Sequence, residues 1–156
     1  MAEHQRPPAL LLPGDSGVYI LWLRLARLEV VRVGRFGRFA LYPGVYAYCG
    51  SAQRHLAARL ARHHRAFKRF RWHVDYLRAR CRHIGTMVFP LEKAGECWLA
   101  QGLVKHAQMQ RPVEKFGASD CRCAGHLAYA VSMQECQWEA VRKHLVTPLD
   151  GRELIG

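Results

Sequence analysis

The first fifty residues alternate between short apolar runs and breaks that contain glycine or proline. Val, Ile, Tyr, Phe and Trp favour strands, whereas Gly and Pro favour the turns between them. Such breaks fall at Gly34–Gly37 and at Pro43-Gly44. The pattern predicts an antiparallel meander of four strands, over residues 17–25, 28–33, 39–42 and 45–49.

At Gly50 the spacing of apolar residues lengthens from two to about 3.6, which is typical of an amphipathic helix. Leu56, Leu60 and Phe67 then form one apolar stripe, and Ser51 is a suitable N-cap. The spacing predicts a basic helix over residues 52–71.

The remainder of the chain again alternates between extended and helical patterns. It predicts a strand over 83–91, a helix over 96–109, a polar loop over 110–125, a strand over 127–131 and a helix over 135–145. Neither an internal repeat nor a long linker divides these segments. We therefore expect an α+β fold, a small antiparallel sheet flanked by helices. Residues 1–14 would form a flexible lead-in, and residues 15–156 a single domain.

The distribution of charged residues along the chain indicates the kind of partner that the protein binds. The chain has 24 Lys and Arg residues against 12 Asp and Glu residues, a net charge of +12. Ten of the basic residues lie between Arg54 and Arg82, where Asp75 is the one acid. A basic surface that only aids solubility would spread its charge more evenly. The clustering favours a polyanionic partner, most simply DNA or RNA.

No apolar run approaches the roughly 18 residues of a membrane helix, and Leu10-Leu11-Leu12 is too short for a signal-peptide core. We therefore expect a cytoplasmic protein with no membrane partner and with six reduced cysteines. Cys121, Cys123 and His126 are residue types that bind zinc. Their spacing matches no common zinc finger and no fourth ligand is evident, so a polar loop is the favoured interpretation.

Two tripeptides place tyrosines beside glycines in the predicted strands, Gly17-Val18-Tyr19 and Tyr48-Cys49-Gly50. We expect these two strands to be paired, so that the tyrosines form a reaction centre for a phosphodiester. Arg59, His63 and Glu96 follow them along the chain. In this order the residues resemble the GIY-YIG nuclease superfamily.

More closely, the chain resembles a small prokaryotic branch of that superfamily, sometimes fused to an endonuclease III-type repair glycosylase. Two segments carry this likeness, Trp-His-x-Asp-Tyr-Leu at residues 72–77 and Gly-x-Ser-Asp-Cys-x-Cys-x-x-His-Leu at residues 117–127. The resemblance spans roughly residues 15–132.

The resemblance implies a metal-dependent endonuclease that hydrolyses DNA phosphodiester bonds, with a role in DNA repair. Tyr48 would orient water or act as general base, with Tyr19 beside it. Arg59 would grip the scissile phosphate, and His63, one helical turn later, would lie on the same face. Glu96 would hold Mg²⁺ or Mn²⁺. A repair glycosylase is a further expected partner.

Other cations would follow the DNA backbone with little reading of sequence. The predicted substrate-binding residues are Arg54, Arg62, Arg65, Lys68, Arg69 and His73. The strand-like spacing of His73 and Asp75 would place them on one side of a strand, where structural hydrogen bonding is the favoured role.

The chain departs from the superfamily pattern in three ways. The long gap between the tripeptides predicts an extra strand pair within residues 28–42. Arg59 lies one residue later than the usual arginine, and Ser51 stands where some members carry lysine. These departures keep alternatives open: a non-catalytic nucleic-acid-binding module that uses the basic helix 52–71, or an interaction domain for a repair glycosylase. Glu96 would then only complement a helix dipole, and the tyrosines would only pack.

Overall fold

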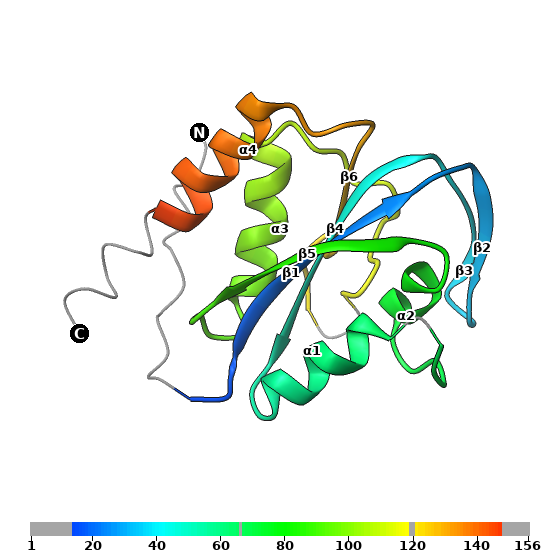
Figure 1. Cartoon of the computed structure of the whole chain (residues 1–156), viewed down its shortest axis with the longest axis horizontal. Coiled ribbons are helices and arrows are strands. Elements are labelled where there is room, and N and C mark those ends of the chain that lie inside the picture. The colour runs from blue at the N-terminus through cyan, green and yellow to red at the C-terminus, as the bar shows by residue number, and fades with distance from the viewer. Residues whose placement is uncertain (1–13, 66, 119–120, 148–156) are drawn as a thin grey trace.

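The computed structural model describes residues 14–65, 67–118 and 121–147, so nearly all of the predicted lead-in lies outside the described residues (Figure 1). The predicted α+β class is confirmed. The strands are β1 (Gly17–Leu25), β2 (Glu29–Val33), β3 (Gly37–Leu41), β4 (Gly44–Ala52), β5 (Arg82–Phe89) and β6 (Leu127–Ala130). The helices are α1 (Leu56–His64), α2 (His73–Arg78), α3 (Gly95–His106) and α4 (Glu135–Val141), which a π-helical turn, Arg142–Val146, extends.

The main sheet is antiparallel, with strand order β5-β1-β4-β6, while β2 and β3 form a separate pair. The predicted meander is therefore wrong, because β1 pairs with β4 rather than with β2. The expected pairing of the two tyrosine strands is confirmed. Burial explains the choice. β1 and β4 are buried along nearly their whole length and suit the centre of a sheet, whereas β2 and β3 are partly exposed. The β2–β3 pair occupies the segment where an extra strand pair was predicted.

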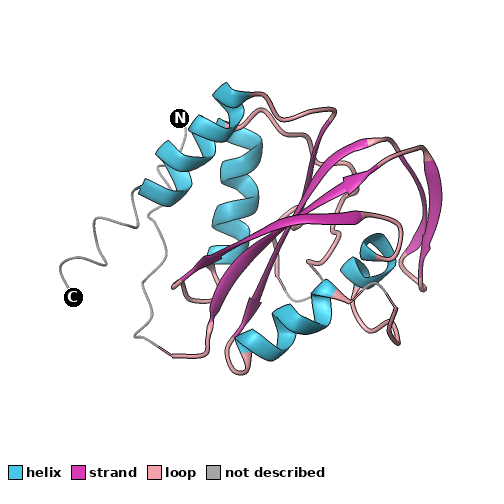
Figure 2. Cartoon of the chain, viewed as in Figure 1, coloured by secondary structure: helices cyan, strands magenta, loops and turns pink. Residues whose placement is uncertain are grey.

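Both faces of the main sheet are covered (Figure 2). Alternate residues of β1 serve the two faces, since successive strand side chains point to opposite sides. Val18 and Ile20 pack with Leu99 of α3, whereas Tyr19 and Leu21 belong to the cluster of α2. Figure 1 shows α3 and α4 on one side and α1 and α2 on the other. Residues on the α1–α2 side build the site described below.

The basic helix is shorter than predicted. Ser51 is not its N-cap, because it continues β4 and pairs with Val18 of β1. The chain turns instead at His55, whose φ of 57° is left-handed, and α1 ends at His64. None of the helices in the described ranges is long and apolar enough to cross a membrane.

The strand-like spacing predicted at His73 and Asp75 is also wrong, since both lie in the short helix α2. The carboxylate of Asp75 accepts hydrogen bonds from the backbone nitrogens of Arg71 and Trp72, at 2.7 and 2.9 Å. These bonds satisfy donors at the start of the helix, which stabilises a helical turn there.

Candidate active site

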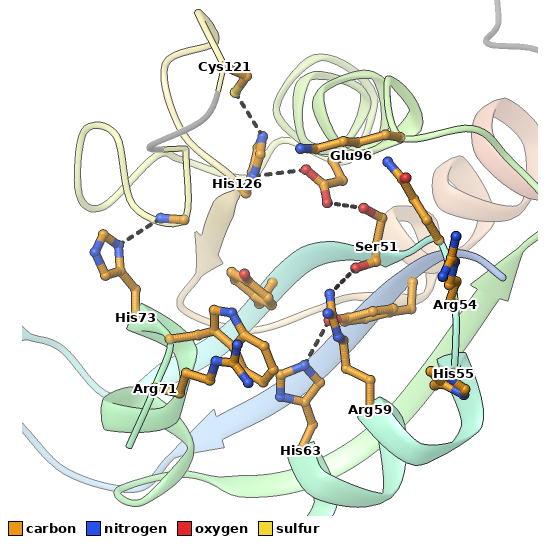
Figure 3. A pocket seen from close by; sticks show the side chains of 16 residues that line it. Ser51, Arg54, His55, Arg59, His63, Arg71, His73, Glu96, Cys121 and His126 are labelled. Carbon is orange, nitrogen blue, oxygen red and sulfur yellow. Dashed lines mark hydrogen bonds and ion pairs between the residues drawn. The ribbon is translucent and has the colours of Figure 1, made fainter. Parts of the chain in front are cut away.

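A pocket of about 720 Å³ lies beside β1, β4 and α1, with the first turn of α3 on its far wall (Figure 3). All five residues predicted to be catalytic line it: Tyr19, Tyr48, Arg59, His63 and Glu96. They come from four different elements and span 78 positions of the chain, from 19 to 96. The fold therefore brings together the residues on which the sequence hypothesis depends.

The two tyrosines lie on one face of neighbouring strands. In the β1–β4 ladder Tyr19 is opposite Gly50, and Leu21 is opposite Tyr48. A Cβ atom on Gly50 would lie 2.7 Å from the Tyr19 ring, so any larger residue at position 50 would collide with the ring. A Cβ atom on Gly117 would lie 2.8 Å from the Tyr48 ring, and the φ of Gly117 is +70°. Both rings thus depend on glycine beside them.

The hydroxyl of Tyr19 lies 2.7 Å from Nε2 of His63. Burial, reinforced by the charge of Lys68, lowers the pKa of His63 to about 3, so its ring is neutral. Burial also raises the pKa of Tyr19 above its ordinary value, although Arg59 opposes the shift. The second ring nitrogen, Nδ1, faces Asp75 at 4.0 Å. With a proton on Nδ1, His63 accepts a hydrogen bond from the Tyr19 hydroxyl at Nε2.

Tyr48 packs edge-on against Phe116, with ring centres 6.2 Å apart, and its ring centre lies 6.5 Å from that of His63. Burial raises the pKa of Tyr48, and the neighbouring Tyr19 and Glu96 act in the same direction. A general base was one of the two roles predicted for Tyr48, and it would need a phenol that loses its proton readily. The structure instead favours a protonated phenol that orients a partner by hydrogen bonding.

Glu96 belongs to a chain of polar contacts across the pocket (Figure 3). Its Oε1 accepts a hydrogen bond from the Ser51 hydroxyl, and its Oε2 lies 3.6 Å from Nδ1 of His126. Arg59 donates from Nη1 to the Ser51 carbonyl oxygen at 2.5 Å. The side chain of Glu96 keeps 13% exposure, so it remains open to the pocket. Sequence reasoning missed the linking roles of Ser51 and His126.

Trp72 is another residue that the sequence hypothesis left without a role. Its ring centre lies 4.8 Å from the guanidinium of Arg59, 4.5 Å from that of Arg62 and 5.1 Å from that of Arg71. Guanidinium groups at these distances are attracted to the ring and held in orientation. Trp72 and Arg71 both line the pocket.

A comparison with protein families matches residues 18–147 to the family described as Domain of unknown function DUF123. The chain belongs to this family. The matched range contains every residue that lines the pocket. Neither the search of curated proteins nor the search of solved structures finds a match.

The predicted DNA-contacting cations of this DUF123 domain divide into two groups. Arg62 donates twice to the buried carboxylate of Asp75, at 2.9 Å each, and Lys68 lies 3.6 Å from it with 6% exposure. Burial alone would raise the pKa of Asp75, but these hydrogen bonds hold it below its usual range. Arg62 and Lys68 therefore hold α1 to α2 from outside the pocket lining.

The remaining predicted contacts lie at or near the surface. Arg54 lines the pocket, whereas Arg65 and Arg69 are exposed outside its lining. His73 also lines the pocket, but its Nδ1 accepts a hydrogen bond from the Gly117 nitrogen at 3.0 Å and its ring stacks on Phe36. These are structural contacts, the role that was favoured for His73 from the sequence.

The loop before β6 holds more than polar residues. Ligand atoms of Cys97, Cys121, Cys123 and His126 lie within 4.8 Å of one another in this DUF123 domain. The fourth residue that the motif lacked is Cys97 of α3, which follows Glu96 directly. Motif spacing could not find it, because it lies 24 positions before Cys121. The expectation that the motif has no fourth residue able to bind a metal is corrected accordingly.

Proposed function

We propose that this chain is a metal-dependent endonuclease that hydrolyses DNA phosphodiester bonds in DNA repair. The observation that carries the proposal is the convergence of five side chains on one pocket: Tyr19, Tyr48, Arg59, His63 and Glu96. Phosphodiester hydrolysis needs a positioned water, donors for the phosphoryl oxygens and help for the leaving oxygen. The pocket offers a group for each need.

The charge of the pocket suits an anion. Four cationic side chains line it, from Arg54, Arg59, Arg71 and Lys93, against one carboxylate, from Glu96. Arg59 and Arg71 are already oriented by Trp72, which lowers the entropy lost when they bind phosphate. Ser51 stands where some members of the superfamily carry lysine. Lys93 supplies an ammonium group to the pocket in its place.

The Tyr19–His63 pair supplies the group that holds water. Because the Tyr19 proton is directed to Nε2 of His63, the lone pairs of the Tyr19 oxygen can accept from a water molecule. As the water oxygen bonds to phosphorus and the bond to the leaving oxygen breaks, a water proton moves through Tyr19 to His63. The alkoxide that leaves then takes a proton from solvent. The negative charge of a bound phosphate raises the pKa of His63 toward that task. The protonated phenol of Tyr48 helps to orient the same water.

Glu96 would hold Mg²⁺ or Mn²⁺. A hard cation of this kind takes one or two protein carboxylates and fills its other positions with water and substrate oxygens. The pocket fits this need, because one carboxylate lines it and the Ser51 hydroxyl fixes the orientation of that carboxylate. When bound, the ion would supply charge stabilisation at the phosphoryl and leaving oxygens.

Strand cleavage of a panel of duplex, nicked, flapped and branched DNA, with Mg²⁺ or Mn²⁺, tests the proposal. Glu96→Gln and Tyr48→Phe are compared with wild type at matched DNA occupancy. The exposed residues Glu139 and Tyr42 provide the matched controls Glu139→Gln and Tyr42→Phe. We expect the first two variants to bind DNA without cleaving it and the controls to cleave normally. Undiminished cleavage by Glu96→Gln would overturn the proposed site.

One observation favours a second candidate, a non-catalytic nucleic-acid-binding module. Burial keeps Tyr19 and Tyr48 protonated, and a cationic pocket with protonated phenols binds phosphate without needing to cleave it. Salt-dependent DNA binding with no cleavage on any substrate would select this function. We also propose a cytoplasmic location and a repair glycosylase as partner. Co-purification of the glycosylase with this protein would test the partnership.

A further inference from the structure

Four side chains that can bind a metal converge beside the pocket wall. Cys97 lies in the first turn of α3, while Cys121, Cys123 and His126 come from the loop that leads into β6. The Sγ atoms of Cys97 and Cys121 are 3.6 Å apart, and those of Cys121 and Cys123 are 3.2 Å apart. A disulfide would hold its sulfurs at about 2.05 Å. The three thiols are therefore grouped without being bonded.

The separations match the edges of a tetrahedron around one ion. Zinc–sulfur bonds of about 2.3 Å and zinc–nitrogen bonds of about 2.05 Å give S···S edges of about 3.8 Å and S···N edges of about 3.6 Å. Nε2 of His126 lies 3.4 Å from the sulfurs of both Cys97 and Cys121. These separations are about 0.2–0.6 Å shorter than the tetrahedral edges. Small side-chain movements would therefore bring the four groups to the distances that a bound ion requires.

The backbone fixes the ends of this cluster independently of any ion. The nitrogen of His126 donates to the Phe116 carbonyl at 2.8 Å, and the His126 carbonyl accepts from the Cys49 nitrogen at 2.9 Å. Cys97 is fixed by α3. Cys121 and Cys123 belong to the connecting loop, so a shared ion would join that loop to the helix.

The second nitrogen of His126 faces a carboxylate. Nδ1 lies 3.6 Å from Oε2 of Glu96, while Nε2 points to the thiols (Figure 3). Metal-binding histidines usually direct the other ring N–H to a carboxylate, which fixes the tautomer and the ring orientation. Glu96 therefore completes the arrangement of groups expected around a zinc-bound histidine.

We propose that Cys97, Cys121, Cys123 and His126 bind one zinc ion that holds the loop before β6 against α3. Three thiolates and one imidazole are a common donor set of structural zinc sites, which have no open position for substrate. Binding displaces three thiol protons to solvent, and the ion with its three thiolates then carries a net charge of −1. This site goes beyond the proposed nuclease function and does not depend on it. Its further consequence, that His126 positions Glu96 at the pocket, does rest on that function.

Metal content of the intact protein, purified under reducing conditions, tests the proposal directly. Elemental mass spectrometry should find one zinc per chain in wild type and less than a tenth of that in Cys97→Ser and Cys123→Ser. Cys136 is exposed and lies outside the cluster, so Cys136→Ser is the matched control and should keep its zinc. Iron or copper in place of zinc, a Cys97–Cys121 disulfide in mass spectra, or no retained metal would each overturn the proposal.

A second measurement protects the test against variants that fail to fold. Wild-type protein exchanged with Co²⁺ should show the intense thiolate-to-cobalt charge-transfer band of three sulfur ligands and the visible bands of a tetrahedral ion. A spectrum without thiolate bands would overturn the site whatever the variants do. Cleavage is measured separately: protein that holds zinc but cleaves no DNA would contradict the nuclease function alone, and protein that cleaves DNA without zinc would contradict the zinc site alone.

Discussion

Tyr19 and His63 form a neutral pair, 2.7 Å apart, in the wall of the pocket. The partner residues are 44 positions apart in the chain, and the bond joins the first strand of the sheet to the last turn of α1. In the described part of the chain, the other nitrogen of His63 is buried without a hydrogen-bond partner. The bond to Tyr19 is therefore the one that keeps this imidazole from being an unpaired buried group.

Tyr19→Phe should lower both stability and activity. Removing the hydroxyl leaves His63 without its hydrogen bond, which we expect to lower the free energy of unfolding by about 1–3 kcal/mol. Tyr48→Phe should abolish cleavage while lowering stability by less than about 1 kcal/mol, because no hydrogen bond to a described residue is lost. Urea denaturation at constant zinc concentration measures the free energy of unfolding of both variants, with the exposed Tyr42→Phe as control. Equal destabilisation by the two pocket variants would contradict the distinction.

The low pKa of His63 predicts a loss of stability in mild acid. The folded protein keeps this imidazole neutral down to a pH of about 3, while the unfolded chain takes up a proton below about 6.5. The contribution is thus fully present above pH 6.5 and is lost as the pH falls toward 3. His63→Gln should remove about 1–2 kcal/mol of the stability difference between pH 7 and pH 5.

The exposed His55 provides the control for this measurement. Asn tolerates the left-handed backbone found there, so His55→Asn removes an imidazole without adding strain. The stabilisation that Asp75 contributes is also lost as the pH falls, but only below its unfolded pKa of about 3.9, which lies outside the range from pH 7 to pH 5. A pH profile that His63→Gln leaves unchanged would contradict the burial of a neutral ring.

The basic residues near α1 should separate into stabilising and DNA-binding groups. Arg62→Gln breaks the paired hydrogen bonds to buried Asp75 and should cost about 2–4 kcal/mol of stability. Arg54→Gln should leave stability within about 0.5 kcal/mol but lower the salt slope of DNA binding by about 1. Arg24, exposed on β1 and outside the pocket lining, serves as control. A salt slope reduced by Arg24→Gln as much as by Arg54→Gln would argue against binding at the pocket.

Ser51→Ala should slow cleavage without weakening DNA binding. The variant loses the hydrogen bond that orients Glu96 but keeps the backbone carbonyl that Arg59 contacts. Loss of such a supporting contact typically costs about tenfold in activity or metal affinity. Titration with Mg²⁺ should show a raised requirement for metal, with DNA affinity within about twofold of wild type. The exposed Ser132→Ala is the control, and an unchanged metal requirement in Ser51→Ala would contradict the role.

The sequence was most informative where one residue type fixes local structure. Glycines bracketed the tyrosine strands, and the change of period at Gly50 located the start of helical structure within a few residues. Those patterns were enough to predict the α+β class. The five residues that line one pocket were chosen from the resemblance to the GIY-YIG nuclease superfamily. The alternation of apolar runs and turns favoured pairing of consecutive strands, whereas the two tyrosine tripeptides led to the correct expectation that β1 pairs with β4.

Local patterns also misled where long-range contacts decide the outcome. Serine is a residue type that favours the N-cap position, yet pairing with Val18 keeps Ser51 in the strand. Asp75 has a strand-like spacing from His73, yet its carboxylate caps α2. Cys97 belongs to no sequence motif. Its thiol joins the other metal-binding side chains only because α3 packs beside the loop before β6. Ser51 and Cys97 depend on residues too distant in sequence for a spacing rule. Asp75 instead depends on backbone donors only three and four residues before it, which a strand-like spacing does not reveal.

The separate β2–β3 pair determines where this domain can change in length. β4 carries Tyr48, Gly50 and Ser51 in one continuous ladder, so an inserted residue there would turn the following side chains to the wrong face of the sheet. The turn between β2 and β3 belongs to no strand of the main sheet. Extra residues placed in that turn would leave the pairing of β1 with β4 intact. It is a position in the described chain where a fluorescent label or an added segment could be accommodated, as long as Phe36 keeps its stacking on the pocket residue His73.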